Sequence, residues 1–400
     1  MHYRRYDYIK KLLHHRGSPY VKVLYGPRGC GKTTILADFA FRMVRRGFPE
    51  SRILVITFDD PAVPRDAQTV YEGIISRMEG QEETLLILDE VEKLPHFEKV
   101  IDRLFLHRHV DIYLSGSGRS VLTPALKKLL PGRIQPLFVF PLSYREYLSG
   151  RKANDERFAE YLTESTYPGI DRSRKAAGME QLKGMVNTAF MEQVLLENPA
   201  LRASMLNRVV NYIASHAGEP VSLHQMAVAL GRAGRPLLKK SVYAYLGALE
   251  GSGLLVMAPF IQVADDLGRT VPTAEKACFF YFADPHIGSL YVPDTSRAVQ
   301  GRLAAAIELC RRFAGISAGK TPYGLVDFIT RSQDVETAWQ YIPHLKGEEA
   351  EKKIRVLQNL SRQYKKRILT LDTVPGEVLG EADPDILVDN LSLWMENKVG

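Results

Sequence analysis

The feature that most constrains the fold is a glycine-rich loop between a short strand and a helix. Residues 21–26 (VKVLYG) are apolar and β-branched, which predicts a strand, and residues 31–47 carry apolar side chains at helical spacing. The run at 26–33 reads Gly-Pro-Arg-Gly-Cys-Gly-Lys-Thr and satisfies the pattern G-x-x-x-x-G-K-T. Because a strand precedes the loop and a helix follows it, we interpret the run as a phosphate-binding P-loop rather than a chance glycine-rich turn.

The residue types in this loop fit the phosphates of a nucleotide. Glycines tolerate the dihedral angles that let successive backbone N–H groups wrap phosphate oxygens, and the helix N-terminus adds its dipole. We expect Lys32 to reach the β- and γ-phosphates of ATP and the Thr33 hydroxyl to ligate Mg²⁺. The predicted nucleotide-binding residues are Gly26, Pro27, Arg28, Gly29, Cys30, Gly31, Lys32, Thr33 and Thr34.

A second motif supplies acidic residues for hydrolysis. Residues 84–90 (TLLILDE) form an apolar run that ends in two acids, which is typical of a strand buried in a parallel sheet. Ligands bind at the carboxyl ends of such strands, so we predict that Asp89 holds Mg²⁺ and that Glu90 acts as general base on the attacking water. The alternative is that the acidic pair caps the next helix.

The alternation of strands and helices predicts an α/β fold. Further strands are expected at 52–60 and 110–117, with helices near 66–80, 98–106 and 120–130, which gives a parallel sheet covered by helices on both faces. The strand at 110–117 ends in Ser-Gly-Ser beside the predicted nucleotide site. There Ser117 can orient the lytic water, and a plain Ser-Gly turn is the alternative.

The motifs together resemble the archaeal-type AAA ATPase family. The resemblance rests on GPRGCGKTT, LLILDEVEKLPHFEKVIDRL, LSGSGRSVL and LLPGRIQPLFVFPLSYREYL, with Ser115 in place of Thr and Tyr144 and Tyr147 in place of Phe. It implies an AAA-type P-loop NTPase domain over residues 1–150, of the class with an additional strand and a catalytic Glu. It also implies that Arg133 touches the γ-phosphate in its own or a neighbouring subunit, beside the catalytic residues Glu90, Lys32 and Ser117. Arg119 and Arg28 are competing cations.

Three further segments follow the ATPase segment. Residues 151–200 are predicted to form a helical connector that acts as a lid or a plain linker. Residues 201–290 show three helical patterns followed by two strands, which predicts a winged helix-turn-helix domain and also resembles the family. Residues 291–400 resemble the degenerate, PD-(D/E)XK nuclease-like α/β domain that ends the family's chains.

The predicted winged helix is a candidate DNA-binding element. Basic residues outnumber acidic ones over 201–250, and the N-terminal part of the second motif helix enters the major groove in helix-turn-helix proteins. Packing against the nucleotide domain or a partner protein is the alternative. The predicted DNA contacts are Arg232, Arg235, Lys239, Lys240, Ser241 and Tyr243.

The nuclease-like segment lacks most of a nuclease site. Asp327 matches the family's metal-binding Asp, but Gln340 and Ile342 stand where the family has an acid and a Lys, and Glu308 is the carboxylate left on the preceding helix. A magnesium nuclease needs clustered carboxylates and a cation for the transition-state charge. We therefore predict a catalytically inactive domain that packs or binds nucleic acid.

Composition limits the cellular locations and partners that we expect. Three widely spaced cysteines make neither a disulfide framework nor a zinc cluster, no apolar run is long enough for a membrane helix, and the first residues are not a secretory signal. We therefore expect a cytoplasmic protein without a membrane partner. The formal net charge of +7 is concentrated in the first 50 residues, where part of it concerns ATP.

The sequence thus predicts an Mg²⁺-dependent ATPase that is DNA-associated through its winged helix. The family resemblance is compatible with homo-oligomers. One alternative is a regulatory nucleotide switch that acts on a protein partner, and another is an ATP-dependent nuclease.

Overall fold

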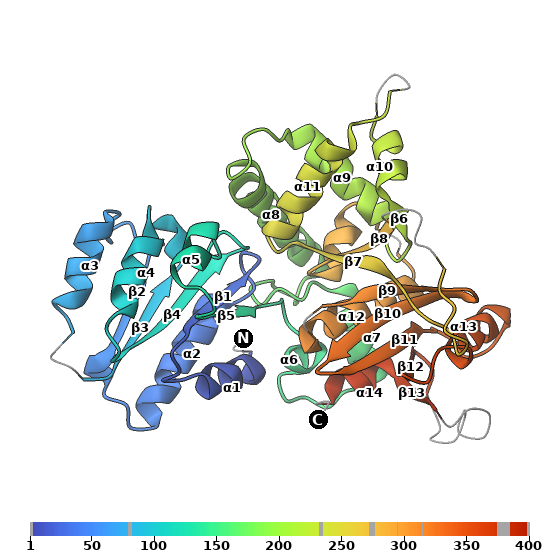
Figure 1. The fold of residues 1–400 in the computed structure, drawn as a ribbon, viewed down its shortest axis with the longest axis horizontal. Helices are drawn as coiled ribbons and strands as arrows, with labels where there is room; N and C mark the ends of the chain where they lie inside the picture. Colours follow the sequence, from blue (N-terminus) through green and yellow to red (C-terminus); the bar gives the residue numbers. More distant parts are fainter. Residues whose placement is uncertain are drawn as a thin grey trace.

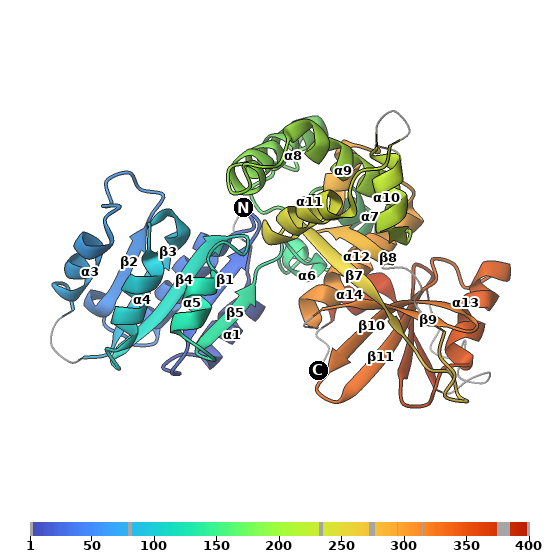
Figure 2. The same ribbon diagram turned by 45° about the horizontal axis from the view of Figure 1, so that its top comes forward.

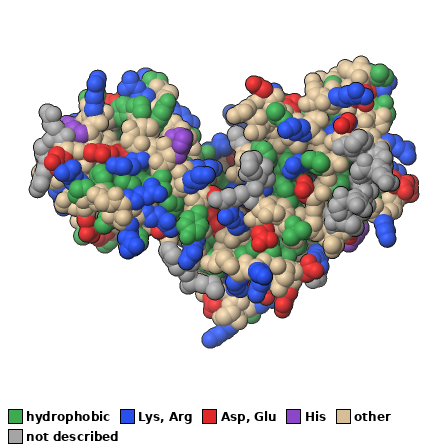
Figure 3. All heavy atoms as spheres, turned by 90° about the horizontal axis from the view of Figure 1, so that it is seen from below, with side chains coloured by type: hydrophobic (Ala, Val, Ile, Leu, Met, Phe, Trp, Pro, Cys, Tyr) green, Lys and Arg blue, Asp and Glu red, His purple; other side chains and the backbone are tan. Residues whose placement is uncertain are grey.

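The computed structural model describes residues 3–78, 82–231, 235–271, 277–293, 295–313, 315–373 and 385–397. The chain forms two lobes, an N-terminal lobe up to residue 138 and a C-terminal lobe that contains the rest (Figure 1). Seen from below, a notch in the outline separates them (Figure 3). Among the described residues, no helix is long and apolar enough to cross a membrane.

The N-terminal lobe is built on a parallel sheet. Its strands are β1 (Val21–Gly26), β2 (Ile53–Thr57), β3 (Thr84–Asp89), β4 (Val110–Ser117) and β5 (Ile134–Phe138). The five strands run in the order β2-β3-β4-β1-β5 and all neighbours are parallel. β4 thus lies between the strands that carry the P-loop and the acidic pair, so the predicted α/β class with an additional strand is confirmed. Strand β5 was not predicted from the sequence.

Helices cover both faces of this sheet, as predicted. They are α1 (Tyr6–His14), α2 (Lys32–Arg45), η1 (Glu50–Arg52), α3 (Ala67–Ile75), η2 (Val91–Lys93), α4 (Phe97–Phe105) and α5 (Pro124–Leu129). Apolar residues of α1 and α2 pack on the face that contains Leu24 and Tyr113. Residues of α3, α4 and α5 pack on the opposite face, around Val23 and Leu114. The alternation of side chains along the strands therefore divides the apolar core into two layers.

A group of helices forms the first part of the C-terminal lobe. It comprises α6 (Tyr144–Leu148), α7 (Asp155–Thr163), α8 (Lys175–Ala189), the π-helical segment η3 (Phe190–Leu195), α9 (Ala203–Ser215), α10 (Leu223–Ala229) and α11 (Lys239–Gly251). Ser222 caps the N-terminus of α10, in a capping box with Gln225. The apolar sides of α8 to α11 share one buried core with α1 and α2. The helical group therefore packs directly on the N-terminal lobe.

The second sheet crosses a predicted domain boundary. Its strands are β6 (Val221–Ser222), β7 (Leu255–Gln262), β8 (Ala277–Phe282), β9 (Ser317–Thr321), β10 (Gly324–Ser332), β11 (Val335–Tyr341), β12 (Lys365–Thr370) and β13 (Ile386–Asn390). They run in the order β13-β12-β11-β10-β9-β7-β8-β6. β7 pairs with β8 as the predicted hairpin and with β9 through Phe260 and Ala318. The sheet is therefore continuous across residue 290, and Figure 2 shows β7 running from the helices into it.

Four helical segments complete the C-terminal lobe. They are η4 (Pro285–Leu290), α12 (Arg297–Arg312), α13 (Glu348–Gln358) and α14 (Leu391–Glu396). α12 is buried over most of its length, while α13 packs on β10 and β11. These two helices supply the charged side chains that meet inside the lobe.

Candidate nucleotide site

The loop between β1 and α2 adopts a conformation that requires its glycines. Gly29 and Gly31 have φ angles of +79° and +96°, in the left-handed region. A Cβ atom on Gly26 would lie 2.3 Å from the carbonyl oxygen of Val139. Gly31 immediately precedes α2, so the backbone N–H groups at the start of that helix face the loop. The structure thus places the predicted nucleotide-binding residues 26–34 in one strand–loop–helix unit.

Lys32 is buried in this unit with weak internal compensation for its charge. Its Nζ lies 3.3 Å from the carbonyl oxygens of Gly26 and Pro27 and 3.4 Å from Ser117 Oγ. The nearest carboxylate oxygen, Oε1 of Glu90, is 3.7 Å away. A buried ammonium held mostly by neutral oxygens is suited to an incoming anion such as a phosphate.

The two predicted Mg²⁺ ligands lie side by side at the carboxyl edge of the sheet. The Thr33 hydroxyl donates a hydrogen bond of 2.7 Å to Asp89 Oδ2. Ser115 donates to the other carboxylate oxygen of Asp89 and accepts the backbone N–H of Glu90 at 3.2 Å. Hydroxyl and carboxylate oxygens are hard ligands, and Mg²⁺ takes few of them from protein when phosphates and water complete its shell. The residues present therefore fit Mg²⁺ bound together with a nucleotide.

Glu90 has a strained backbone at the end of β3. Its φ angle is +53°, a left-handed conformation that costs a non-glycine residue about 1–3 kcal/mol. Its side chain makes no capping hydrogen bond to the following turn. The carboxylate instead accepts a hydrogen bond of 3.1 Å from Ser117 Oγ. The capping alternative for the acidic pair is therefore wrong, and Glu90 and Ser117 lie together beside Lys32.

Two residues that contact this site were not predicted from the sequence. Arg5 is buried and donates to the carbonyl oxygens of Cys30 (2.8 Å) and Phe140 (2.7 Å) and to Glu146 (2.8 Å), so it ties the P-loop to the chain that leaves the sheet. Glu92, in η2, accepts the backbone N–H of Ser117 at 2.7 Å. Both contacts join residues far apart in sequence, and the local pattern carried no signal for them.

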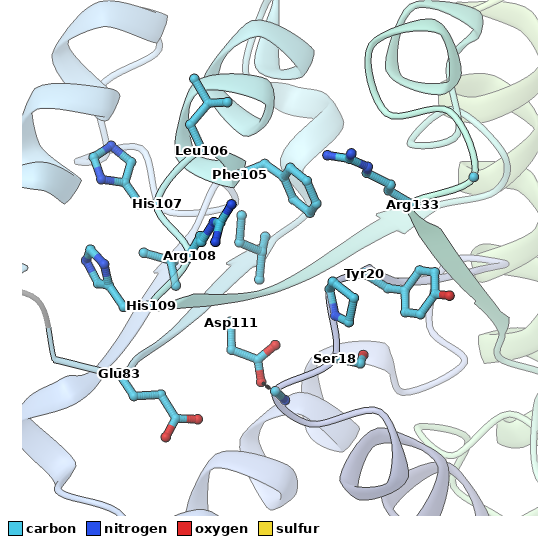
Figure 4. A pocket seen from close by; sticks show the side chains of 15 residues that line it. Ser18, Tyr20, Glu83, Phe105, Leu106, His107, Arg108, His109, Asp111 and Arg133 are labelled. Atoms are coloured by element: carbon cyan, nitrogen blue, oxygen red, sulfur yellow. Dashed lines mark hydrogen bonds between the residues drawn. The ribbon is translucent and has the colours of Figure 1, made fainter.

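Arg133 lies at the opposite edge of the sheet. It precedes β5, and its carbonyl oxygen accepts the N–H of Val21 at the amino end of β1. The length of β1 separates that edge from the P-loop by about 17 Å. Its guanidinium lies 5.3 Å from the centre of the Phe105 ring, in an open cavity of about 1120 Å³ (Figure 4). Contact of Arg133 with the γ-phosphate of its own subunit is therefore wrong, and contact with a neighbour's nucleotide stays a prediction.

The competing cation Arg119 lies on the P-loop side of the sheet. It follows the tip of β4, and its backbone N–H donates to the carbonyl oxygen of Gly251 at 2.6 Å. Its guanidinium pairs with Glu250 at 3.2 Å and is more than half exposed. The end of α11 is thus attached to the strand that carries Ser117.

The predicted DNA contacts gather at the other end of α11. Arg235, Lys239, Lys240 and Tyr243 are exposed and Ser241 is half-buried, while Arg232 lies outside the described residues. Lys239 and Lys240 form the first turn of the helix. The structure therefore brings most of the predicted residues onto one accessible helix end.

The predicted nuclease remnant is a closed ionic cluster. Oδ1 of Asp327 pairs with Arg302 at 2.7 Å, while Oδ2 pairs with Lys353 at 2.9 Å and accepts the N–H of Tyr341 at 2.8 Å. Burial raises the pKa of Asp327, but Arg302 and Lys353 outweigh it and hold the pKa below its usual range. Two internal cations thus occupy the surroundings where a metal ion would have to bind.

The other polar residues of the predicted nuclease remnant are also bound by neighbouring protein groups. The Gln340 amide is hydrogen-bonded to the backbone of Leu325 and Asp327, and Glu308 is paired with Arg311 and Arg312. Within the described ranges, no group of three or more His, Cys, Asp or Glu side chains is arranged to hold a metal. The donor set therefore does not fit a magnesium nuclease.

Comparison with known proteins identifies the N-terminal segment. Residues 18–148 match the family model described as AAA domain. An uncharacterized protein of Haemophilus influenzae is 24% identical over 346 residues, which cover 82% of this chain and 84% of the relative. The matched segment contains the P-loop, Asp89, Glu90 and Ser117, so the resemblance noted in the sequence is confirmed for this segment.

Two solved structures align with much of this chain. The Walker-type ATPase of Pyrococcus abyssi aligns over 73% of this chain and 96% of its own, at 14% identity and a TM-score of 0.48. The ORC1 protein of Aeropyrum pernix, solved in complex with DNA, aligns over 76% of this chain and 93% of its own, at 12% identity and a TM-score of 0.31.

Proposed function

We propose that this protein, whose residues 18–148 match the AAA domain model, binds ATP with Mg²⁺ and hydrolyses it, and that the nucleotide controls its hold on DNA. One observation carries the ATPase part. Side chains from the P-loop, β3 and β4 converge at one edge of the sheet, with the Lys32 ammonium, the Glu90 carboxylate and the Ser117 hydroxyl within 3.7 Å of one another.

Each of these residues has a task in the proposed reaction. Lys32 binds the β- and γ-phosphates, and Thr33 and Asp89 hold Mg²⁺, which when bound neutralises charge on the transferred phosphoryl group. Glu90 accepts the proton of the attacking water. Ser117 orients the Glu90 carboxylate through their hydrogen bond and can also contact the water.

Contacts between α11 and the nucleotide site support coupling to DNA. A Cβ atom on Gly118 would lie 2.5 Å from the carbonyl oxygen of Gly251, and one on Gly253 would lie 3.1 Å from the Pro27 nitrogen. The C-terminal end of α11 therefore touches both the P-loop and the tip of β4. A helix of 13 residues is a rod of about 20 Å, so a small movement at this end displaces Lys239 at the other.

The connector supports the same coupling, because it lies against the P-loop. Cβ atoms placed on Gly29 and Gly31 would approach Met185 of α8 and Pro168, at 2.4 and 3.6 Å respectively. The loop before Pro168 is anchored by Asp284, which follows β8 and accepts hydrogen bonds from Ser165 (2.5 Å) and Thr166 (3.0 Å). These contacts favour the lid interpretation of the connector over a plain linker.

A mobility-shift experiment tests the DNA part. The double variant Lys239→Glu/Lys240→Glu should weaken a salt-dependent shift of duplex DNA, because it removes two phosphate contacts and adds repulsion. Lys127→Glu/Lys128→Glu is the matched control, since these exposed lysines sit on α5 in the N-terminal lobe. Absence of any shift by the wild type at low salt would remove DNA from the proposal.

A protein partner is the second candidate, and one observation favours it. Apolar side chains are exposed on α10 and at the start of α11: Leu238 is 75% exposed, Val228 51% and Tyr243 45%. The ATPase rate with and without single-stranded, duplex and branched DNA separates the candidates. A slow rate that no DNA changes, and that a protein partner raises, would support a regulatory nucleotide switch.

Assembly and location complete the proposal. Because Arg133 is remote from its own P-loop, we propose that it contacts the nucleotide of a neighbouring copy in a homo-oligomer. Cys30, Cys278 and Cys310 are free thiols, which agrees with the proposed location in a reducing cytoplasm.

A further inference from the structure

Glu92 is hydrogen-bonded to the tip of β4 and has no role in the proposed reaction as described above. Its Oε1 accepts the backbone N–H of Ser117 at 2.7 Å. Its Oε2 is buried and has no hydrogen-bond partner among the described residues. A Cβ atom on Gly116 would lie 2.7 Å from that Oε2, so the glycine of Ser-Gly-Ser is needed to let the carboxyl group approach.

The strained backbone of Glu90 brings two carboxyl groups to the same serine. Because Glu90 is left-handed, the chain turns sharply into η2, and Glu92 returns to β4 beside Glu90. Ser117 is thus bound from two sides: its hydroxyl donates to Glu90 at 3.1 Å and its backbone N–H donates to Glu92. A strained residue retained at such a point is a common feature of functional sites.

We infer that Glu92 is a positioning residue for hydrolysis, which fixes the backbone of Ser117 and, through the Ser117 hydroxyl, the carboxylate of Glu90. The inference rests on the proposed ATPase activity. Glu92 acts through Ser117 and does not itself need to reach the nucleotide.

The charge state of Glu92 agrees with this role. Burial, reinforced by the charge of Glu90, raises the pKa of Glu92 to about 8. At neutral pH the side chain is therefore mostly an uncharged carboxylic acid. It can accept the N–H of Ser117 without repelling the Glu90 carboxylate, and an amide of the same shape can do the same.

Steady-state kinetics test the inference with two variants of Glu92. Glu92→Ala should lower kcat for ATP hydrolysis roughly 10- to 100-fold, with KM nearly unchanged, because a misplaced Glu90 impairs the chemical step and not ATP binding. Glu92→Gln should stay within about threefold of the wild type, because the amide oxygen still accepts the N–H of Ser117. Glu50→Ala is the control, since Glu50 is exposed in the similar short turn η1.

A second measurement does not depend on hydrolysis. Hydrogen exchange of the peptide that contains Ser117, measured without nucleotide, should be roughly 3- to 10-fold faster in Glu92→Ala and unchanged in Glu92→Gln. Equal exchange in Glu92→Ala and the wild type, or a kcat of Glu92→Gln as low as that of Glu92→Ala, would overturn the inference. A wild type without ATPase activity would overturn the proposed function and the hydrolytic role of Glu92, while exchange would still decide whether Glu92 holds Ser117.

Discussion

Glu90 and Asp327 are both buried carboxylates of strand or strand-end residues, and each has a lysine as a neighbour, yet their surroundings differ. Glu90 lies 3.7 Å from Lys32 and is otherwise hydrogen-bonded to a neutral hydroxyl. Asp327 makes two ion pairs, at 2.7 and 2.9 Å, and accepts a backbone N–H. The first carboxylate keeps oxygen lone pairs for a ligand or a proton, whereas the second is satisfied by the protein itself.

The difference separates a carboxylate that is available to a ligand from one that the fold itself neutralises. A carboxylate whose charge is compensated by its own fold contributes to stability, and removing it leaves buried cations unpaired. A carboxylate beside an incompletely compensated lysine is ready to act with a bound anion. In the C-terminal lobe, Arg302 from α12 and Lys353 from α13 close the site from two helices.

The two lysines provide the largest expected contrast. Lys32→Ala should weaken ATP binding roughly 10²- to 10⁴-fold, because it removes charge-assisted hydrogen bonds to two phosphates, worth about 3–6 kcal/mol together. Lys353→Ala should leave ATP binding unchanged and lower the thermal stability. Binding is measured by titration with a fluorescent ATP analogue. A loss of ATP affinity in Lys353→Ala would contradict the assignment of Lys32, and not Lys353, to the nucleotide site.

The two carboxylates provide the next contrast. Asp327→Ala should destabilise the protein by about 3–5 kcal/mol, because the buried Arg302 and the half-buried Lys353 then lose their anion. The wild type and Glu90→Gln should unfold at nearly the same denaturant concentration, since Glu90 has few internal partners to lose. Chemical denaturation followed by circular dichroism gives both values. An Asp327→Ala variant as stable as the wild type would contradict the structural role.

The pH dependence of stability should have opposite signs in the two regions. Because the folded pKa of Glu92, about 8, exceeds its unfolded value, its contribution is complete at acid pH and is lost as pH rises toward 8. The stability of Glu92→Gln relative to the wild type should therefore increase by about 3–4 kcal/mol between pH 5 and pH 8, since each pH unit between the two pKa values changes it by about 1.4 kcal/mol. The folded pKa of Asp327 is lowered, so its contribution persists at neutral pH and is lost only as pH falls below about 4. Denaturation curves at several pH values test both signs.

The smallest expected effect concerns communication away from the nucleotide site. Gly118→Ala should reduce the influence of ATP on DNA affinity by a few fold, because the new Cβ atom presses on Gly251 at the end of α11. Gly132→Ala is a matched control: both glycines have positive φ, +61° and +68°, but Gly132 has nothing within 4 Å of the new atom. Equal behaviour of the two variants would mean that this contact does not transmit the nucleotide state.

The sequence predicted which residues meet at the carboxyl edge of the first sheet, because the signals for them are local. The P-loop, Asp89, Glu90 and Ser117 each lie at the end of a strand with a clear apolar pattern, and parallel strands bring such ends together. Arg5 and Glu92 were missed because their partners are distant in the chain and depend on how the strands are ordered.

Other predictions depended on elements that were missed. Arg133 was expected near the γ-phosphate, but it precedes β5, whose direction places it at the amino edge of the sheet. The two strands β7 and β8 were predicted, but β9 was not, so the pairing of β7 with β9 could not be predicted from the sequence. Local periodicity identified β7 and β8 but not β5 or β9, and tertiary contacts determine which strands are neighbours.

The most direct test of the account compares Glu90→Gln with the wild type. Phosphate release at saturating ATP and Mg²⁺ should fall roughly 10²- to 10⁴-fold, because the amide cannot accept a proton from water, while ATP affinity stays within a few fold of the wild type. Undiminished phosphate release by Glu90→Gln would contradict the assignment of this edge of the sheet as the catalytic site.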